Sequence, residues 1–282
     1  MINKIIIIFV KLLNFSLFFH ASHDENFDTI EAKQLSNIED LRFSLINIPF
    51  GNRIYYFLSY RKISNNFFNV ENFTFIYLLD YDIKWGRKTA DALEFQVKNY
   101  VKSIDNQSIE KTNEQEVFLK QRISESNESM STIRNKITHY TTILFAFASA
   151  LVYLFTKTSV AFCPSFVALI YYYLLLIITV QVINLALFLR KGMMINSFYQ
   201  SSFKDLRRSD YKHELTKSFY RDWLAKNDDT RYFAGIVKNA EKYLYRSICI
   251  GLISFVIVNS FSNENTYIKN DSVLTISETY II

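Results

Sequence analysis

Two acidic residues stand close enough together in the sequence to suggest chemistry. Asp80 and Asp82 end an apolar, aromatic run, and in a strand both would point to the same face of a sheet. Paired carboxylates can act as general acid and base or bind a metal ion. Neither a histidine nor a third acidic residue stands nearby in the sequence, so a solvated strand end is the favoured interpretation.

A second polar pair, Gln181 and Asn184, lies inside a stretch without charged residues, 158–189. Three positions apart, the two side chains would share one face of a helix. Two interpretations are open. The amides form hydrogen bonds between helices, each of order 1 kcal/mol, or they line a water-filled path through a membrane.

A group of basic residues lies further along the chain. Residues 190–246 carry 13 Lys and Arg against 7 Asp and Glu, a net charge of +6. Such a stretch beside apolar segments indicates membrane topology and contact with lipid head groups, and it could hold an anionic ligand such as a nucleotide phosphate. No nucleic-acid-binding motif is present, so nucleic acid is not an expected partner. The candidate contact residues are Lys204, Arg207, Arg208, Lys212 and Arg221.

The sequence contains none of the common catalytic or cofactor motifs. GxxxxGK[ST], GxGxxG and GxSxG are absent, and the two cysteines and four histidines form no metal-binding spacing. We therefore expect no enzyme activity, no cofactor and no metal. Half of the 282 residues are apolar, yet only 5 are Gly and 2 are Pro. This composition excludes a many-stranded barrel or sandwich and favours long helices.

Three stretches are apolar enough to cross a bilayer, which takes about 20 helical residues. They are 138–156, 162–189 and 243–261. The link between the first two is so short that they must form an antiparallel hairpin. Arg246, near the start of the third stretch, could reach the membrane interface. The fold class predicted is therefore a mainly α membrane protein, with a membrane domain over 137–261.

The apolar segment within residues 1–20 allows three interpretations. It has the order of a signal peptide, it could be a fourth membrane span, or it could be an interfacial or dispensable leader. Lys11 stands near the middle of the apolar run 5–19, which is unusual for a signal peptide.

The distribution of charge predicts the orientation. By the positive-inside rule, the loop 190–242 is cytoplasmic. Residues 21–136 precede the first span and so lie on the same side, while the tail 262–282 lies outside. We therefore expect a multi-pass protein of the inner membrane.

The cytoplasmic part before the first span is predicted to be a small α+β domain. Strands are expected within 41–85, with a type II′ hairpin turn at Gly51-Asn52. Helices are expected over 88–136, broken near residue 105. In the loop 190–242, a turn and a new helix start are expected at 227–229. A heptad seam either packs on the helical loop or forms a coiled coil between copies; its members are Leu119, Ile123, Ser126, Met130, Ile133 and Ile137.

The layout of a membrane hairpin, a helical loop and a last span led in by KNAEKYLYRS resembles that of small membrane effectors of bacterial antiphage systems. The Pycsar membrane effectors and SLATT-type proteins belong to this group. The resemblance covers roughly residues 130–262 and rests on this layout and on residues 239–246. It implies a homo-oligomeric effector that impairs the inner membrane after an upstream sensor protein or nucleotide signal. The alternative is a membrane-anchored scaffold that binds a protein partner through its N-terminal domain.

Overall fold

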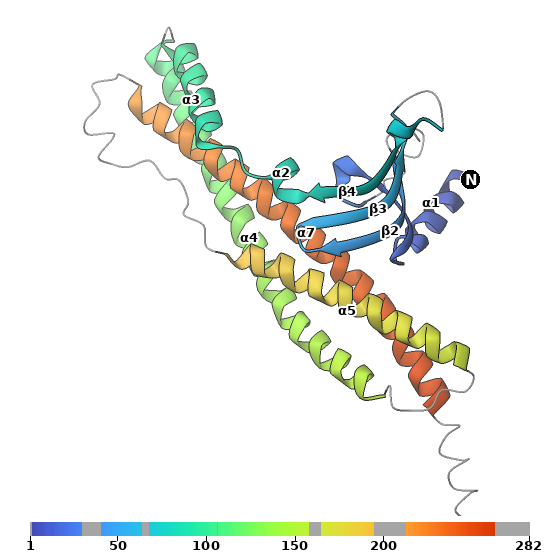
Figure 1. Ribbon diagram of the computed structural model, residues 1–282. Helices are drawn as coiled ribbons and strands as arrows, with labels where there is room; N and C mark the ends of the chain where they lie inside the picture. Colours follow the sequence, from blue (N-terminus) through green and yellow to red (C-terminus); the bar gives the residue numbers. More distant parts are fainter. Residues whose placement is uncertain are drawn as a thin grey trace, which may run out of the picture. The chain divides into compact units, whose positions relative to one another are not determined.

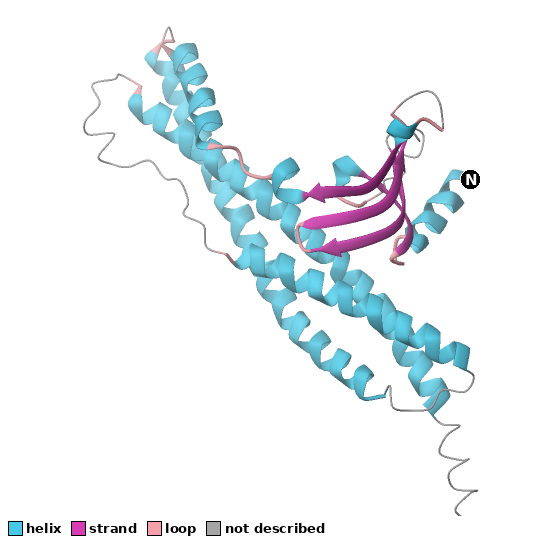
Figure 2. Ribbon diagram, in the orientation of Figure 1, coloured by secondary structure: helices cyan, strands magenta, loops and turns pink. Residues whose placement is uncertain are grey.

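The computed structural model of the chain is mostly helical, with one small sheet near the N-terminus (Figures 1 and 2). It describes residues 2–29, 41–63, 68–105, 107–157, 165–194 and 213–262. The chain forms two compact units. Unit 1 comprises 1–80, 141–187 and 240–282, and unit 2 comprises 81–140 and 188–239.

Three long helices contain the predicted membrane spans. They are α4 (Ile109–Thr156), α5 (Ser165–Met193) and α7 (Glu214–Ser262). Each has an apolar window long enough to cross a membrane, which confirms three helices of the predicted kind. The first three residues of the predicted span 162–189 and residues 263–282 of the tail lie outside the described residues.

The apolar parts of these helices share a core in unit 1. Tyr171 and Ile178 of α5 are buried against residues of α4 and α7, including Leu154 and Ile250. The Tyr171 hydroxyl donates to the backbone oxygen of Leu154 at 2.7 Å. Gly251 of α7 lies so close to α5 that an added Cβ would stand 3.2 Å from Ile178 Cδ1. The absence of a side chain at Gly251 therefore permits close helix packing, as the small residue suggests.

The sheet of unit 1 is an antiparallel meander with the strand order β1-β2-β3-β4. The predicted strands within 41–85 are confirmed. The sequence did not predict β1, which includes residues on both sides of residue 20, the predicted end of the leader. β1 is short and lacks a turn signal before it, so nothing marks it in the sequence. The strands are β1 (Phe18–His23), β2 (Leu41–Phe50), β3 (Arg53–Arg61) and β4 (Phe73–Asp80).

The turn between β2 and β3 lies where Gly51-Asn52 predicts it, because Phe50 pairs directly with Arg53. Gly51 has a φ of +57°, which a type II′ turn requires at its first central position. A Cβ at Gly51 would also lie 3.2 Å from the side chain of Leu187 on α5. Glycine therefore satisfies both the turn and the close approach of the helix.

The buried face of the sheet is more polar than usual. In most half-buried antiparallel sheets the apolar side chains are inside and the polar ones face water. Here four of the eight buried residues of β2 and β3 are polar, and the other four include Leu41, Ile54 and Tyr56. The backbone at Leu58, with a φ of +51°, lies where the alternation shifts by one residue. The polar buried residues are Arg42, Ser44, Asn47 and Ser59, and the exposed apolar residues are Phe43, Leu45, Ile48, Phe50 and Leu58.

The first helix, α1 (Ile2–Leu13), is only 12 residues long. At 1.5 Å per residue it extends about 18 Å, well short of the hydrocarbon layer of about 30 Å. The length of α1 thus disfavours the interpretation of residues 1–20 as a fourth span.

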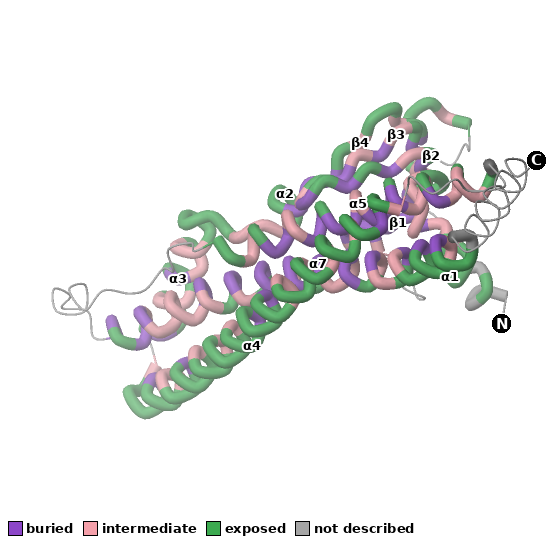
Figure 3. Tube along the Cα trace, turned by 90° about the horizontal axis from the view of Figure 1, so that it is seen from below, coloured by how far each residue is buried: buried purple, intermediate pink, exposed green. Residues whose placement is uncertain are grey.

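Unit 2 contains α2 (Tyr81–Trp85), α3 (Ala90–Ile104) and parts of α4 and α7. The predicted helix break near residue 105 is confirmed, since α4 begins at Ile109. The heptad seam of α4 is buried or half-buried, while most of this helix is exposed (Figure 3). A shallow cavity beside Ser126 and Met130 is also lined by Lys226 and Thr230 of α7. The seam therefore packs within the chain, as the first of its two interpretations states.

The turn predicted at 227–229 is wrong, because α7 runs through these residues without interruption. The carboxylate of Asp228 accepts a hydrogen bond from the backbone nitrogen of Lys88 at 2.7 Å. Asp229 pairs with Arg87 at 2.9 Å. Both aspartates thus bind the segment before α3, and neither caps a new helix.

Candidate functional site

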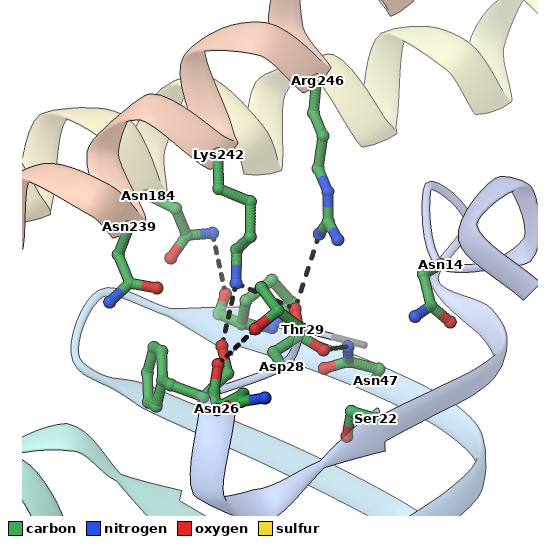
Figure 4. A network of polar contacts seen from close by, with 12 residues as sticks. Asn14, Ser22, Asn26, Asp28, Thr29, Asn47, Asn184, Asn239, Lys242 and Arg246 are labelled. Atoms are coloured by element: carbon green, nitrogen blue, oxygen red, sulfur yellow. Dashed lines mark hydrogen bonds and ion pairs between the residues drawn. The ribbon is translucent and has the colours of Figure 1, made fainter. Parts of the chain in front are cut away.

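Polar side chains from β1, β2 and α7 converge on one buried carboxylate of unit 1, that of Asp28 (Figure 4). Lys242 and Arg246 of α7 place their nitrogens 3.2 and 3.5 Å from Asp28 Oδ2. His20 Nε2, from β1, and Asn47 Nδ2, from β2, both contact Asp28 Oδ1, the latter at 3.5 Å. We call these five residues the Asp28 cluster.

Local structure explains why the members of the Asp28 cluster meet. Lys242 and Arg246 are four positions apart, so both side chains leave the same face of α7. Asp28 follows the short 3-10 helix η1 (Asp24–Asn26). Phe27 and Asp28 have φ values of +41° and +67°, a left-handed conformation that costs roughly 1–2 kcal/mol for each such residue. Lys242 Nζ also binds the Phe27 carbonyl oxygen at 3.2 Å, so the cluster stabilises this turn.

The electrostatics of the cluster keep Asp28 ionised. Asp28 is 1% exposed, and burial alone would raise the pKa of its carboxyl group. His20, Lys242 and Arg246 outweigh that effect, so the pKa of Asp28 lies well below its usual range. The carboxylate is therefore charged at neutral pH, and its charge is balanced by cations from α7.

A second buried carboxylate, Asp24, lies four residues earlier in the chain. Arg42 of β2 binds it through two nitrogens, at 3.1 and 3.0 Å, and Arg61 of β3 binds it at 3.1 Å. The Arg42 guanidinium also lies over the Tyr77 ring, 3.4 Å from its centroid. The bidentate pair with Arg42 and the contact with Arg61 bind η1 to the start of β2 and the end of β3.

Between the two carboxylates lies Tyr56 of β3, which is fully buried. Its hydroxyl accepts a hydrogen bond from the Ser22 hydroxyl at 3.0 Å. Burial, together with the negative charge of Asp28, raises the pKa of Tyr56 well above its usual value. The phenol thus stays neutral at physiological pH.

Gln181 and Asn184, the polar pair predicted inside the membrane, differ in their contacts. Asn184 Oδ1 accepts from the backbone nitrogen of Gly51 at 2.5 Å, and Asn184 Nδ2 donates to the Pro49 carbonyl oxygen at 3.0 Å. Asn184 therefore binds the β2–β3 turn and not a neighbouring helix. Gln181 is also buried, but its Oε1 has no hydrogen-bond partner among the described residues.

The predicted carboxylate pair does not form as a pair. β4 ends at Asp80 and Asp82 already belongs to α2, so the strand geometry that would align them is missing. Asp80 pairs with Arg53 at 2.8 Å. Asp82 pairs with Lys191 and accepts a hydrogen bond from the Tyr232 hydroxyl at 3.0 Å. Each carboxylate is thus engaged by its own partner.

The predicted basic site is described only in part. Lys204, Arg207, Arg208 and Lys212 lie outside the described residues. Arg221 pairs with Glu94 of α3 at 2.9 Å. A cavity of about 330 Å³ beside Arg221 is also lined by Glu94, Asp228 and Asp229, and these carboxylates disfavour an anionic ligand there.

Arg246, which the sequence suggests could reach the membrane interface, pairs with the buried carboxylate of Asp28. Asp28 and His20 carry no recognisable signal in the sequence. Only the cations at 242 and 246, at the entrance of an apolar span, were a usable signal, since such residues usually have a partner.

The Asp28 cluster is a structural connection between the segment after β1, the sheet and α7. It combines a carboxylate with fixed cations, but it places no nucleophile beside a general base. Within the described residues, no group of three or more His, Cys, Asp or Glu side chains could hold a metal ion. No family model, curated protein or solved structure matches the chain.

Replacing Asn184 with Leu should lower the free energy of unfolding by about 1–3 kcal/mol, because the amide of Gly51 and the carbonyl of Pro49 would be buried without partners. Gln181→Leu is the matched control on the same helix and should have a smaller effect. Thermal unfolding of the detergent-solubilised protein measures both. Equal effects of the two substitutions would contradict the role assigned to Asn184.

Replacing Asp28 with Asn should lower the free energy of unfolding by about 3–5 kcal/mol, since Lys242 and Arg246 would lose their buried counter-charge. Glu128→Gln, at an exposed position of α4, should change it by less than about 0.5 kcal/mol. Denaturant titration in detergent gives both values.

The Asp28→Asn substitution also tests how the free energy of unfolding depends on pH. Because the pKa of Asp28 is lowered on folding, its stabilising contribution is present at neutral pH and is lost only as the pH falls below about 4. The difference in unfolding free energy between the two proteins should therefore hold from pH 8 to 5. A difference that already disappears at pH 6 would show that Asp28 is not held ionised.

Proposed function

We propose that the chain is an inner-membrane effector that oligomerises and impairs membrane integrity when triggered, as the resemblance to antiphage effectors implies. An upstream sensor protein or a nucleotide signal is the expected trigger. Positive residues in the loop 190–242 support a cytoplasmic location for that loop and for the N-terminal part of the chain. The sheet would then be accessible to a trigger inside the cell.

The observation that carries the proposal is the Asp28 cluster. A triggered effector needs a stable resting state and an element whose displacement changes the membrane helices. The cluster binds the sheet to α7, and α7 continues as one helix through its apolar window. The turn of β2–β3 covers Asn184 in the middle of an apolar stretch of α5.

Displacement of the sheet would therefore expose polar groups of α5 and α7 to an apolar environment. Lys242 and Arg246 would lose Asp28, and the Asn184 amide would lose the backbone of the turn. In an apolar environment the Asn184 amide would seek new hydrogen-bond partners, and Asn184 of other copies can supply them, because an amide both donates and accepts. Assembly through these groups would place polar side chains inside the membrane, which is how the proposed effector would damage it.

Expression of the Asp28→Ala variant in bacterial cells should depolarise the membrane without a trigger, at a level where the wild-type protein leaves the potential intact. The physical reason is that the variant cannot hold the resting state. A potential-sensitive dye measures the effect, and immunoblotting of the membrane fraction matches the amounts. Glu128→Ala is the control on an exposed face of α4.

A second variant separates this mechanism from general misfolding. Adding Asn184→Leu to Asp28→Ala should restore the potential, because the polar group on α5 is then missing. The proposal is wrong if Asp28→Ala inserts at the wild-type level and the potential stays unchanged, or if the double variant depolarises as strongly as the single one.

One observation favours the alternative function, a scaffold that binds a protein partner. β4 is an edge strand, it has no Lys or Pro, and its side chains Phe73, Phe75 and Ile76 are exposed. Unprotected edges of this kind pair with strands of other chains. A partner strand would extend the sheet at β4.

The scaffold function predicts a stable partner of the full-length protein that is lost when Phe75 is replaced by Asp. Affinity purification from the native cell in mild detergent tests this, with Glu128→Gln as the control bait. A fragment of residues 21–136 is unsuitable because it cuts β1. Finding the same proteins with wild-type and Phe75→Asp baits would count against a β4 binding site.

A further inference from the structure

We propose that α1 is an in-plane membrane anchor whose exposed apolar face contacts the acyl chains at the edge of the bilayer. This site is separate from the proposed effector function and does not depend on it. Four large apolar side chains of α1 are each about 60% exposed: Ile5, Ile8, Phe9 and Leu12. Their spacing of three, one and three positions places them on one face of a helix.

The other side of α1 is fixed to the sheet. Val10 packs against Ala21 and Leu41 of the first two strands. Asn14 clamps the end of the helix, since its Nδ2 donates to the Ala21 carbonyl oxygen at 2.5 Å and its Oδ1 accepts from the Ala21 nitrogen at 2.9 Å. The exposed face is therefore held in a defined direction.

The segment after α1 connects this face to the membrane helices. Phe15 and Leu17 pack on the apolar cluster formed by α4, α5 and α7. The hydroxyls of Ser16 and Tyr173 are 2.6 Å apart, and the ring of Phe18 stacks on that of Tyr173 with centroids 6.1 Å apart. Tyr173 belongs to α5, so α1 ends beside the surface that the bilayer must cover.

The length and side chains of α1 fit a helix that lies at the membrane interface and not one that crosses the bilayer. Figure 1 shows α1 lying crosswise to α5. The helix is too short to span, and the exposed Lys11 on its flank can extend its ammonium to the head groups while the apolar side chains enter the acyl region. A groove of about 310 Å³ lies where Val10 and Leu13 of α1 meet Phe43 and Leu45 of the sheet.

Nitroxide labels at single cysteines test the environment of α1 in the full chain, reconstituted in phosphatidylethanolamine–phosphatidylglycerol vesicles. Cys163 and Cys249 are first replaced by Ser. Labels replace Ile5, Ile8 and Leu12 in turn, and collision rates with oxygen and with a water-soluble nickel complex are measured. Leu252, exposed in the apolar window of α7, is the lipid reference, and Glu125, exposed on α4, is the water reference.

All three α1 labels should show an oxygen-to-nickel ratio severalfold above that of the Glu125 label and close to that of the Leu252 label. The three ratios should be similar, because an in-plane helix keeps one depth along its length. A high nickel rate would mean that α1 faces water, and low rates with both reagents would mean that protein covers it. A steady gradient from residue 5 to 12 would indicate a crossing segment. Each of these three results would overturn the proposal.

Discussion

A charged carboxylate in the interior of unit 1 is the constraint on which the rest of the N-terminal structure depends. Asp28 is almost completely buried, and an isolated ion at such a place would be strongly destabilising. The chain resolves this by bringing two cations from α7, one turn apart, to the same oxygen. Those cations lie more than 200 residues later in the sequence. The carboxylate therefore ties the first strand to the last helix.

The polar side chains on the buried face of the sheet follow from the same constraint. That face must supply partners for Asp24 and Asp28, so it carries Arg42 and Asn47, while Phe43, Leu45 and Phe50 are exposed. In water such a sheet would be prone to association. Beside apolar helices, with α1 at its edge, an apolar outer face is compatible with lipid or with a protein partner.

The sequence predicted the parts of the fold that depend on local patterns. Long uncharged runs predicted the apolar helices, and Gly51-Asn52 predicted the hairpin, because helix length and turn geometry are local properties. Prediction from the sequence failed where contacts between residues far apart in the chain determine the structure. Asp228 and Asp229 look like a helix start but bind the segment before α3. Asn184 was expected to bond to another helix or to line a path, and its partner, a turn more than 130 residues away, could not be foreseen. The partners of Asp28 could not be found, since single histidines, lysines and aspartates carry no spacing signal.

The most direct test of this account is a double-mutant cycle between Asp28 and Lys242. Free energies of unfolding are measured in detergent for the wild type, Asp28→Asn, Lys242→Met and the double variant. If the two side chains form the buried ion pair that joins the segment after β1 to α7, the effects should be non-additive, with a coupling energy of about 1 kcal/mol or more. Effects that add to within about 0.5 kcal/mol would show that Asp28 and Lys242 do not interact and would contradict the account.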